Sequence, residues 1–319
     1  MMNSNTVNVC WLKNDQGKPI RGIWDEGLLE HLLSGRLISP SLQYLQFKVC
    51  EEVPKGEPCV IVICGSYFAP RVDDLRKQLE GRGPAIICHM ADEGHLLDSS
   101  ALLRPGDVWW RQIENPDALG ATNFPARPHR AMVSGWRNET IELLRAIHAT
   151  KIEHQGPGPK DLLWAYSGQI NHSYRAACYE ELNRRRDGKM VCSHGFGQGL
   201  PYPEYLALLA RAKIAICPSG PVTADTMRMY EALEAGCLPI CNRRAPGQKG
   251  NYWLHVFGQE PFPCVDDWHK ELPKLLDYFA GDPYALKLKT AQALQWWADY
   301  KLSLVKGIEE DWAKVCAVK

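Results

Sequence analysis

The 319-residue chain contains no apolar run near the roughly 18 residues that a membrane-spanning helix needs. Its first residues, Met1 to Val9, are polar and lack the apolar core of a secretory signal peptide. It also lacks a surplus of charge, because 37 lysines and arginines balance 37 aspartates and glutamates. From these absences we expect a cytoplasmic protein that binds no membrane and that does not bind nucleic acid through net charge alone.

The twelve cysteines include no pair with the Cys-x-x-Cys spacing of a structural zinc site. Most of them lie inside apolar runs, as Cys59, Cys64 and Cys217 do, where a thiol behaves as a small buried hydrophobe. Such cysteines are typical of a reducing compartment, which agrees with a cytoplasmic location.

The length and the hydrophobic content of 45% are sufficient for two domains of ordinary size. Short apolar runs alternate with segments of helical spacing, a pattern typical of parallel βαβ units. The β-branched run Cys59–Cys64 predicts a strand buried on both faces of a parallel sheet. The other predicted strands are Val7–Leu12, Ala85–Cys88 and Val108–Trp110 in the first half, and Leu162–Ser167, Met190–Cys192, Lys213–Cys217 and, as the last, Leu238–Cys241 in the second.

Glycine and proline interrupt both helix and strand over residues 153–160, which we predict to be a linker. It separates a first α/β domain, residues 1–152, from a second, residues 161–285. Residues 286–319 form a predicted helical tail that carries Trp296 and Trp297. This tail either covers the second sheet or crosses back to the first domain.

Three glycine-containing loops follow strands of the second half, namely 167–169, 194–199 and 218–220. Ligands bind outside the carboxyl ends of the strands in open parallel sheets, where these loops would lie. Glycine lets the backbone approach a ligand closely, and helix N-termini offer free N–H groups to phosphate. Glycine is also common in strand–helix turns that bind nothing, so each loop alone indicates little.

The helix predicted over Ala224–Ala235, with Thr223 as its N-cap, carries Arg228 and Glu231 three residues apart on one face. A guanidinium can bind phosphate through two hydrogen bonds, and a carboxylate can accept two ribose hydroxyls. The alternative is a surface ion pair, worth a few tenths of a kcal/mol. The buried strands on both sides of this helix favour the ligand-binding interpretation.

The residues that carry a family resemblance lie mainly between Trp164 and Ile240. They are Trp164–Gly168, Arg175, Tyr205–Leu209, Ala212–Lys213, Cys217–Gly220, Arg228, Glu231–Ala232 and Gly236–Pro239. In this order they resemble the signature of exostosin-like glycosyltransferases. In the first half, Ile87–Glu93 resembles a His-x-x-Asp-Glu segment of bacterial and viral members, and Trp109–Arg111 resembles the segment that follows it.

The resemblance implies an α/β fold of the GT-B type, in which two Rossmann-like domains face each other across a cleft. The donor, a nucleotide-diphosphate sugar and by expectation a UDP-sugar, would bind the second domain, and the acceptor mainly the first. Glu231 would hold the ribose, and Arg228 would contact the diphosphate or the sugar. The complete set of expected donor-binding residues is Ser167, Gly168, Arg175, Pro218, Ser219, Gly220, Thr226, Arg228 and Glu231.

Many retaining GT-B enzymes carry two glutamates separated by seven intervening residues, whereas the position eight residues before Glu231 is occupied by Thr223. This departure favours an inverting mechanism. No Asp-x-Asp triplet occurs, so we expect no metal and no further cofactor. An inverting transfer needs a general base. Asp92 and Glu93 are the first candidates and His89 is the next, although an acidic residue here can equally cap a helix.

The acceptor is expected to contact Trp110, Arg111 and Arg127, which belong to a basic and aromatic cluster. Such a cluster suits a glycan or a small molecule, and also a hydroxymethylated pyrimidine displaced from bacteriophage DNA. A cytoplasmic chain of this kind points to a bacterial cell or a virus-infected host. The alternative function is non-catalytic binding of a nucleotide sugar or glycan. The oligomeric state is left open.

Overall fold

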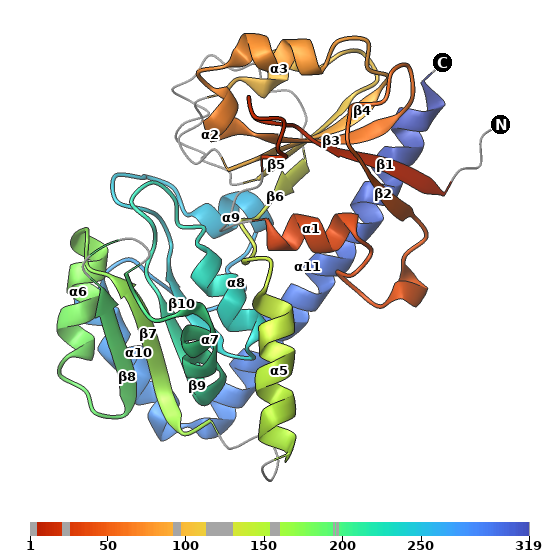
Figure 1. Ribbon diagram of the computed structural model, residues 1–319. Helices are drawn as coiled ribbons and strands as arrows, with labels where there is room; N and C mark the ends of the chain where they lie inside the picture. The colour runs from red at the N-terminus through yellow and green to blue at the C-terminus, as the bar shows by residue number, and fades with distance from the viewer. Residues whose placement is uncertain are drawn as a thin grey trace. The chain divides into compact units, whose positions relative to one another are not determined.

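The computed structural model describes residues 5–20, 26–91, 97–112, 130–153, 160–193, 195 and 198–318. The chain divides into two compact units, which are Met1–Asn138 together with Asp299–Lys319, and Glu139–Ala298. The last helix, α11 (Pro283–Ala317), begins in the second unit and ends in the first (Figure 1). The predicted tail is therefore a helix that returns to the first unit. Most of the predicted linker, residues 154–159, lies outside the described residues.

The first unit contains a six-stranded parallel sheet in the order β2-β1-β3-β4-β5-β6. Its strands are β1 (Thr6–Trp11), β2 (Gln46–Cys50), β3 (Cys59–Cys64), β4 (Ala85–Met90), β5 (Val108–Gln112) and β6 (Arg130–Met132). Among the described residues, the α-helices of this unit that precede α11 are α1 (Gly27–Leu33), α2 (Gly65–Phe68) and α3 (Val72–Gln78).

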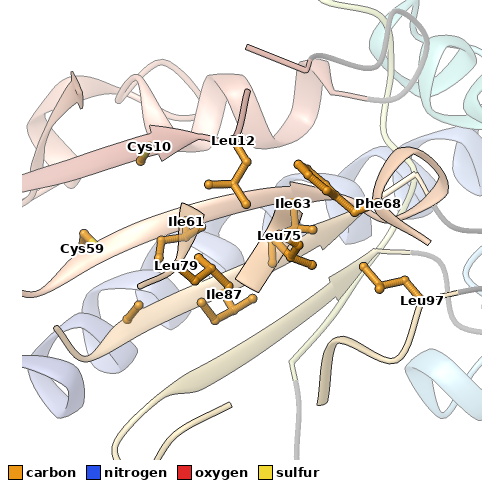
Figure 2. Close-up of a cluster of buried hydrophobic side chains, with 11 residues drawn as sticks. Cys10, Leu12, Cys59, Ile61, Ile63, Phe68, Leu75, Leu79, Ile87 and Leu97 are labelled. Carbon is orange, nitrogen blue, oxygen red and sulfur yellow. The ribbon is translucent and has the colours of Figure 1, made fainter. Parts of the chain in front are cut away.

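The core of the first unit forms where the apolar side chains of β3 and β4 meet α2 and α3. Figure 2 shows Ile61, Ile63 and Ile87 on the strands, with Phe68 and Leu75 from the helices packed against them. Burying one such side chain fully contributes about 1.5–3 kcal/mol. The β-branched run that predicted β3 is therefore a central strand of this core.

The last part of α11 is bound to the first unit through Asp311, which is 2% exposed. Its Oδ2 accepts hydrogen bonds from Trp110 Nε1 at 2.9 Å and from Arg130 Nε at 3.0 Å. Burial opposes the ionisation of this carboxyl, but Arg130, Lys314 and Trp110 outweigh it and hold the pKa of Asp311 below its ordinary value. Asp311 is thus a buried anion that joins α11 to β5 and β6.

The second unit contains a five-stranded parallel sheet in the order β11-β10-β9-β7-β8. Its strands are β7 (Leu162–Gln169), β8 (Gly188–Ser193), β9 (Ala212–Cys217), β10 (Leu238–Asn242) and β11 (Cys264–Val265). Its helices besides the start of α11 are α5 (Thr140–Glu153), α6 (Ser173–Leu182), α7 (Tyr202–Arg211), α8 (Met227–Glu234), α9 (Tyr252–Phe257) and α10 (Trp268–Gly281). Helices α7 and α8 contact the central strands, and α5 contacts both of these helices. Two parallel α/β sheets, with a terminal helix that contacts both units, are consistent with the predicted GT-B fold.

Several details of the second unit differ from prediction, among them the start of α8 and the last strand. Helix α8 begins at Met227 with Thr226 as its N-cap, because Thr223 Oγ1 instead accepts a hydrogen bond from the backbone N–H of Asp225 at 3.1 Å and forms a turn. Strand β10 is not the last strand, since Cys264–Val265 pairs with it. A two-residue strand is too short to produce a periodic pattern, so the sequence contains no signal for it.

Candidate functional site

The carboxyl ends of β7, β9 and β10 lie side by side, because these three strands are neighbours in the sheet. They end at Gln169, Cys217 and Asn242 respectively. Of the loops predicted to bind phosphate, residues 218–220 follow β9, whereas Ser167, Gly168 and Gln169 are the last residues of β7 and pair with β8. The prediction of a loop at 167–169 is therefore wrong, because the strand continues through these residues. Residues 194, 196 and 197 of the remaining predicted loop lie outside the described residues. Local hydrogen bonds then determine which side chains meet at this edge of the sheet.

The loop after β9 is held through Ser219. Its backbone N–H donates to Asn242 Oδ1 at 2.9 Å, and its carbonyl accepts from Arg175 Nε at 3.1 Å and from His172 Nε2 at 3.0 Å. The structure thus brings together Ser219 and Arg175, two of the predicted donor-site residues. It adds His172 and Asn242, which sequence reasoning missed.

The tautomer of His172 follows from these contacts. A carbonyl oxygen only accepts, so Nε2 carries the proton. Burial, followed by the charge of Arg175, lowers the pKa of His172 and keeps the ring neutral. Its Nδ1 is then a buried acceptor that makes no hydrogen bond within the described part of the chain.

Three further buried polar groups at this edge make no hydrogen bond among the described residues. They are the hydroxyl of Ser219, a residue with 0% exposure, the Nδ2 amide group of Asn242, a residue with 1% exposure, and the hydroxyl of Thr226. A buried polar group without a partner costs about 1–3 kcal/mol. Together with His172 Nδ1, these groups leave both donor and acceptor capacity unused at this edge of the sheet.

Arg228 extends from α8 to the end of β7, where its Nε donates to the carbonyl of Ser167 at 2.9 Å. Its guanidinium carbon lies 5.6 Å from the centre of the Tyr166 ring. Burial raises the pKa of Tyr166 to about 12, against the opposing charge of Arg228. A Cβ atom on Gly168 would come within 2.5 Å of Arg228 Nη2, so glycine leaves the space that this guanidinium occupies.

Glu231 lies one turn further along α8 and is only 5% exposed, which excludes a surface ion pair as its role. Its Oε1 accepts a hydrogen bond from the hydroxyl of Tyr202 at 2.7 Å. The same hydroxyl contacts Thr140 Oγ1 at the start of α5. The other predicted residues of this site lie in or beside the loop after β9. Pro218 is buried, Gly220 donates to the carbonyl of Thr223 at 3.0 Å, and Thr226 occupies the N-cap position of α8 without a side-chain hydrogen bond to the helix.

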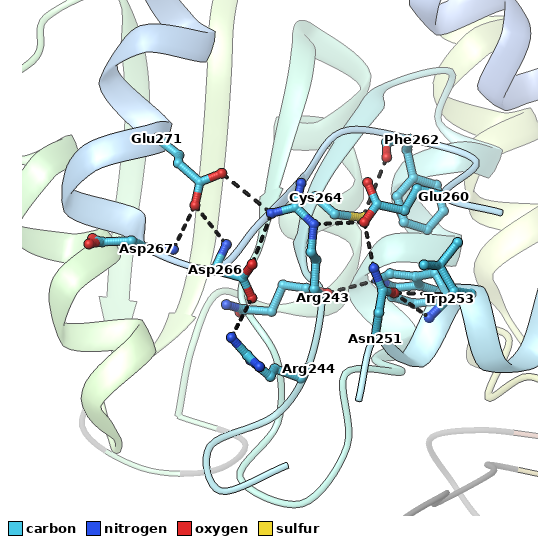
Figure 3. Close-up of polar contacts among 12 residues, drawn as sticks. Arg243, Arg244, Asn251, Trp253, Glu260, Phe262, Cys264, Asp266, Asp267 and Glu271 are labelled. Carbon is cyan, nitrogen blue, oxygen red and sulfur yellow. Dashed lines mark hydrogen bonds and ion pairs between the residues drawn. The ribbon is translucent and has the colours of Figure 1, made fainter. Parts of the chain in front are cut away.

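An ion-pair network follows Asn242 on the same side of the sheet (Figure 3). Arg243 contacts Glu260 at 2.7 Å, Asp266 at 3.2 Å and Glu271 at 3.4 Å. Asn242 itself is held by two indole N–H groups, which donate from Trp268 to Oδ1 at 3.1 Å and from Trp253 to the backbone carbonyl at 2.7 Å. The Trp268 hydrogen bond fixes the Asn242 side chain that supports Ser219, and the Trp253 hydrogen bond fixes the Asn242 backbone.

The candidate residues of the first unit are only partly described. Asp92, Glu93 and Arg127 lie outside the described residues. His89 and Arg111 are buried, and Arg111 Nη1 donates to His89 Nδ1 at 3.1 Å, because a guanidinium only donates.

Trp110, also a predicted acceptor residue, is fully buried and hydrogen-bonded to Asp311. Among the described residues no group of three or more His, Cys, Asp or Glu could hold a metal ion. No helix in the described ranges is long and apolar enough to cross a membrane.

Comparison with known proteins gives one family match. Residues 201–310 match the RXYLT1 C-terminal domain, which is a glycosyltransferase-related family. The match covers about a third of the chain, from the start of α7 into α11, and includes Ser219, Arg228, Glu231 and Asn242. No curated protein matches the chain. The RXYLT1-like domain indicates a glycosyltransferase, whereas the narrower exostosin resemblance stays a prediction.

Proposed function

We propose that this protein is a glycosyltransferase that binds a nucleotide-diphosphate sugar at the carboxyl edge of its second sheet and transfers the sugar to an acceptor hydroxyl. The observation that carries the proposal is the placement of Arg228. One guanidinium contacts the end of β7 from helix α8, which also carries Glu231. Nearby, Ser219 is held by Arg175 and Asn242.

The donor diphosphate would lie along Ser167–Gly168 and Ser219–Gly220. Arg228 would compensate its charge through two-pronged hydrogen bonds, and Arg175 would add a second positive charge. The Ser219 hydroxyl and Asn242 Nδ2 are buried donors without a partner in the described residues, and a small movement of the loop after β9 would let phosphate oxygens accept hydrogen bonds from them. Glu231 would accept the ribose hydroxyls. UDP-sugars are the first donors to test.

The proposed chemistry is a single inverting displacement. The acceptor oxygen forms a bond to the anomeric carbon as the bond from that carbon to the diphosphate oxygen breaks. The diphosphate leaves with the electron pair, and a general base takes the acceptor's proton. Asp92 or Glu93 is the proposed base, with His89 as the alternative. Arg228 and Arg175 would already be in position before the reaction. They would therefore stabilise the negative charge that develops on the leaving diphosphate without having to move. The proposed scheme calls on no metal ion.

Binding of the donor is tested first, by following the unfolding temperature in the presence of a panel of nucleotide sugars. A ligand at about 100 times its dissociation constant stabilises the native state by roughly 2.7 kcal/mol. We expect a stabilising sugar nucleotide whose effect is lost in Arg228→Met. Arg76→Met is the control, because Arg76 is an exposed arginine of α3 in the first unit. If no sugar nucleotide stabilises the wild type, the proposal is wrong.

Transfer is tested next, with radiolabelled donor and three acceptor pools: oligosaccharides, small polyols, and duplex DNA containing 5-hydroxymethylpyrimidines. A DNA acceptor would show affinity that falls steeply as salt increases, because phosphate contacts release counterions. A glycan or small-molecule acceptor would show little salt dependence. Donor binding with neither transfer nor donor hydrolysis would instead establish the non-catalytic alternative.

A further inference from the structure

Glu231 is one member of a hydrogen-bonded chain that joins three helices of the second unit. Tyr202 is the first residue of α7, and its hydroxyl lies 2.7 Å from Glu231 Oε1 on α8. Thr140, the first residue of α5, contacts the same hydroxyl and is fully buried. We propose that Tyr202 is a positioning residue of the donor site, which holds the Glu231 carboxylate in the orientation that receives the ribose. This inference rests on the proposed function of Glu231.

The direction of the hydrogen bonds follows from the groups themselves. An ionised carboxylate only accepts, so the Tyr202 hydroxyl donates its single proton to Glu231. The Tyr202 oxygen is then available as an acceptor, and Thr140 must donate to it. The chain therefore runs in one direction, from Thr140 through Tyr202 to Glu231. Hydrogen bonds arranged head to tail polarise and strengthen one another.

The backbone fixes the position of Tyr202. The residue before it, Pro201, is the N-cap of α7, and Pro203 occupies the first turn, where the restricted φ of proline is already helical. The ring of Tyr202 lies 5.9 Å from that of Tyr205, itself a buried residue. The hydroxyl consequently reaches Glu231 from a side chain with little freedom of its own.

A glutamate side chain loses considerable rotamer freedom when a ligand fixes it. A carboxylate that Tyr202 already holds has lost this freedom before the nucleotide binds, so binding is tighter. Removal of the Tyr202 hydroxyl should weaken ribose binding by roughly threefold to tenfold, the effect expected from ordering one such side chain. The diphosphate contacts of Arg228 do not involve this chain and should be unaffected.

The test compares two kinds of ligand, with and without ribose hydroxyls, on one variant. Isothermal titration would measure the affinities of the uridine, guanosine, adenosine and cytidine diphosphates, and of their 2′,3′-dideoxy forms, for the wild type and for Tyr202→Phe. We expect the variant to lose threefold to tenfold in affinity for the ribonucleotide and to bind the dideoxynucleotide as the wild type does. A general structural defect would weaken both ligands equally. Thr140→Val should act in the same direction with a smaller effect, and it provides the test if Tyr202→Phe does not fold.

The matched control is Tyr284→Phe, which removes a hydroxyl from a tyrosine that is 75% exposed. Equal affinities of Tyr202→Phe and wild type for the ribonucleotide, or equal losses for both ligands, would overturn the positioning role and leave the proposed function intact. If the wild type binds no nucleoside diphosphate at all, the proposed function itself fails, and the positioning role fails with it.

Discussion

Gly168→Ala tests whether Arg228 contacts the donor without changing the arginine itself. The backbone of Gly168 is not in the left-handed region, so alanine fits the strand conformation. A Cβ here would lie 2.5 Å from Arg228 Nη2, 3.2 Å from Arg228 Cζ and 3.1 Å from the hydroxyl of Tyr166. The guanidinium must therefore move by about 1 Å to reach ordinary contact distance. Because the end of a long side chain can move, we expect the fold to remain and the site to change.

The size of the effect follows from the hydrogen bonds that depend on this guanidinium. Hydrogen bonds to a charged group contribute about 1.5–3 kcal/mol each, and a displaced one loses part of this. A loss of about 1–2 kcal/mol corresponds to weaker donor binding by roughly fivefold to thirtyfold. The measurement is the dissociation constant of the nucleotide sugar by isothermal titration, with the unfolding temperature recorded for each variant.

Gly250→Ala is the matched control for this experiment. Gly250 lies in a loop of the same unit, and a Cβ added there would meet no atom within 4 Å. It should leave donor affinity unchanged. If Gly168→Ala binds the donor as tightly as Gly250→Ala does, Arg228 does not contact the ligand in the way proposed. A large fall in unfolding temperature for Gly168→Ala would show that packing, and not the site, depends on this glycine.

Three other predictions concern stability and reactivity. Asn242→Ala leaves the N–H groups of Ser219 and Trp268 without their acceptor, so the free energy of unfolding measured in urea should fall by at least about 2 kcal/mol. An unchanged unfolding midpoint would contradict the proposed support of Ser219 by Asn242. Because the pKa of Asp311 is lower in the folded protein, ionised Asp311 should stabilise the fold fully above about pH 4 and lose this effect as the pH falls further. Asp311→Asn should remove this pH dependence from acid-unfolding curves. An equal pH dependence in both proteins would refute the prediction. Of the twelve cysteines only Cys192 and Cys316 are exposed, and eight are buried. A thiol reagent should therefore modify the two exposed cysteines first and the buried ones only on unfolding. Early modification of buried thiols would contradict the fold.

Short patterns of neighbouring residues predicted individual strands and helices well. The run Cys59–Cys64 is a strand with those same bounds, because consecutive β-branched residues favour a strand buried on both faces. Arg228 and Glu231 were predicted on one helix, since residues three apart share a helix face. The start of α8 was wrong by three residues, because Thr223 and Asp225 resemble a cap but form a turn.

Contacts between distant parts of the chain account for the residues that were missed. Asn242 supports Ser219 across 23 positions, and Tyr202 reaches Glu231 across 29. No pattern of neighbouring residues encodes such a pairing, which depends on strand order and helix packing. Two signals were available. Asn242 is a polar residue that ends an apolar strand, and His172 stands at the N-cap position of the helix that carries Arg175.

Binding and activation of a nucleotide sugar at the edge of the second sheet is the central claim. The most direct measurement is the release of nucleoside diphosphate from the stabilising sugar nucleotide, by the wild type, by Arg228→Met and by Arg76→Met. We predict release by the wild type and Arg76→Met at similar rates, and a loss of at least tenfold in Arg228→Met. Equal release by all three proteins, or none by the wild type with any sugar nucleotide, would contradict the account.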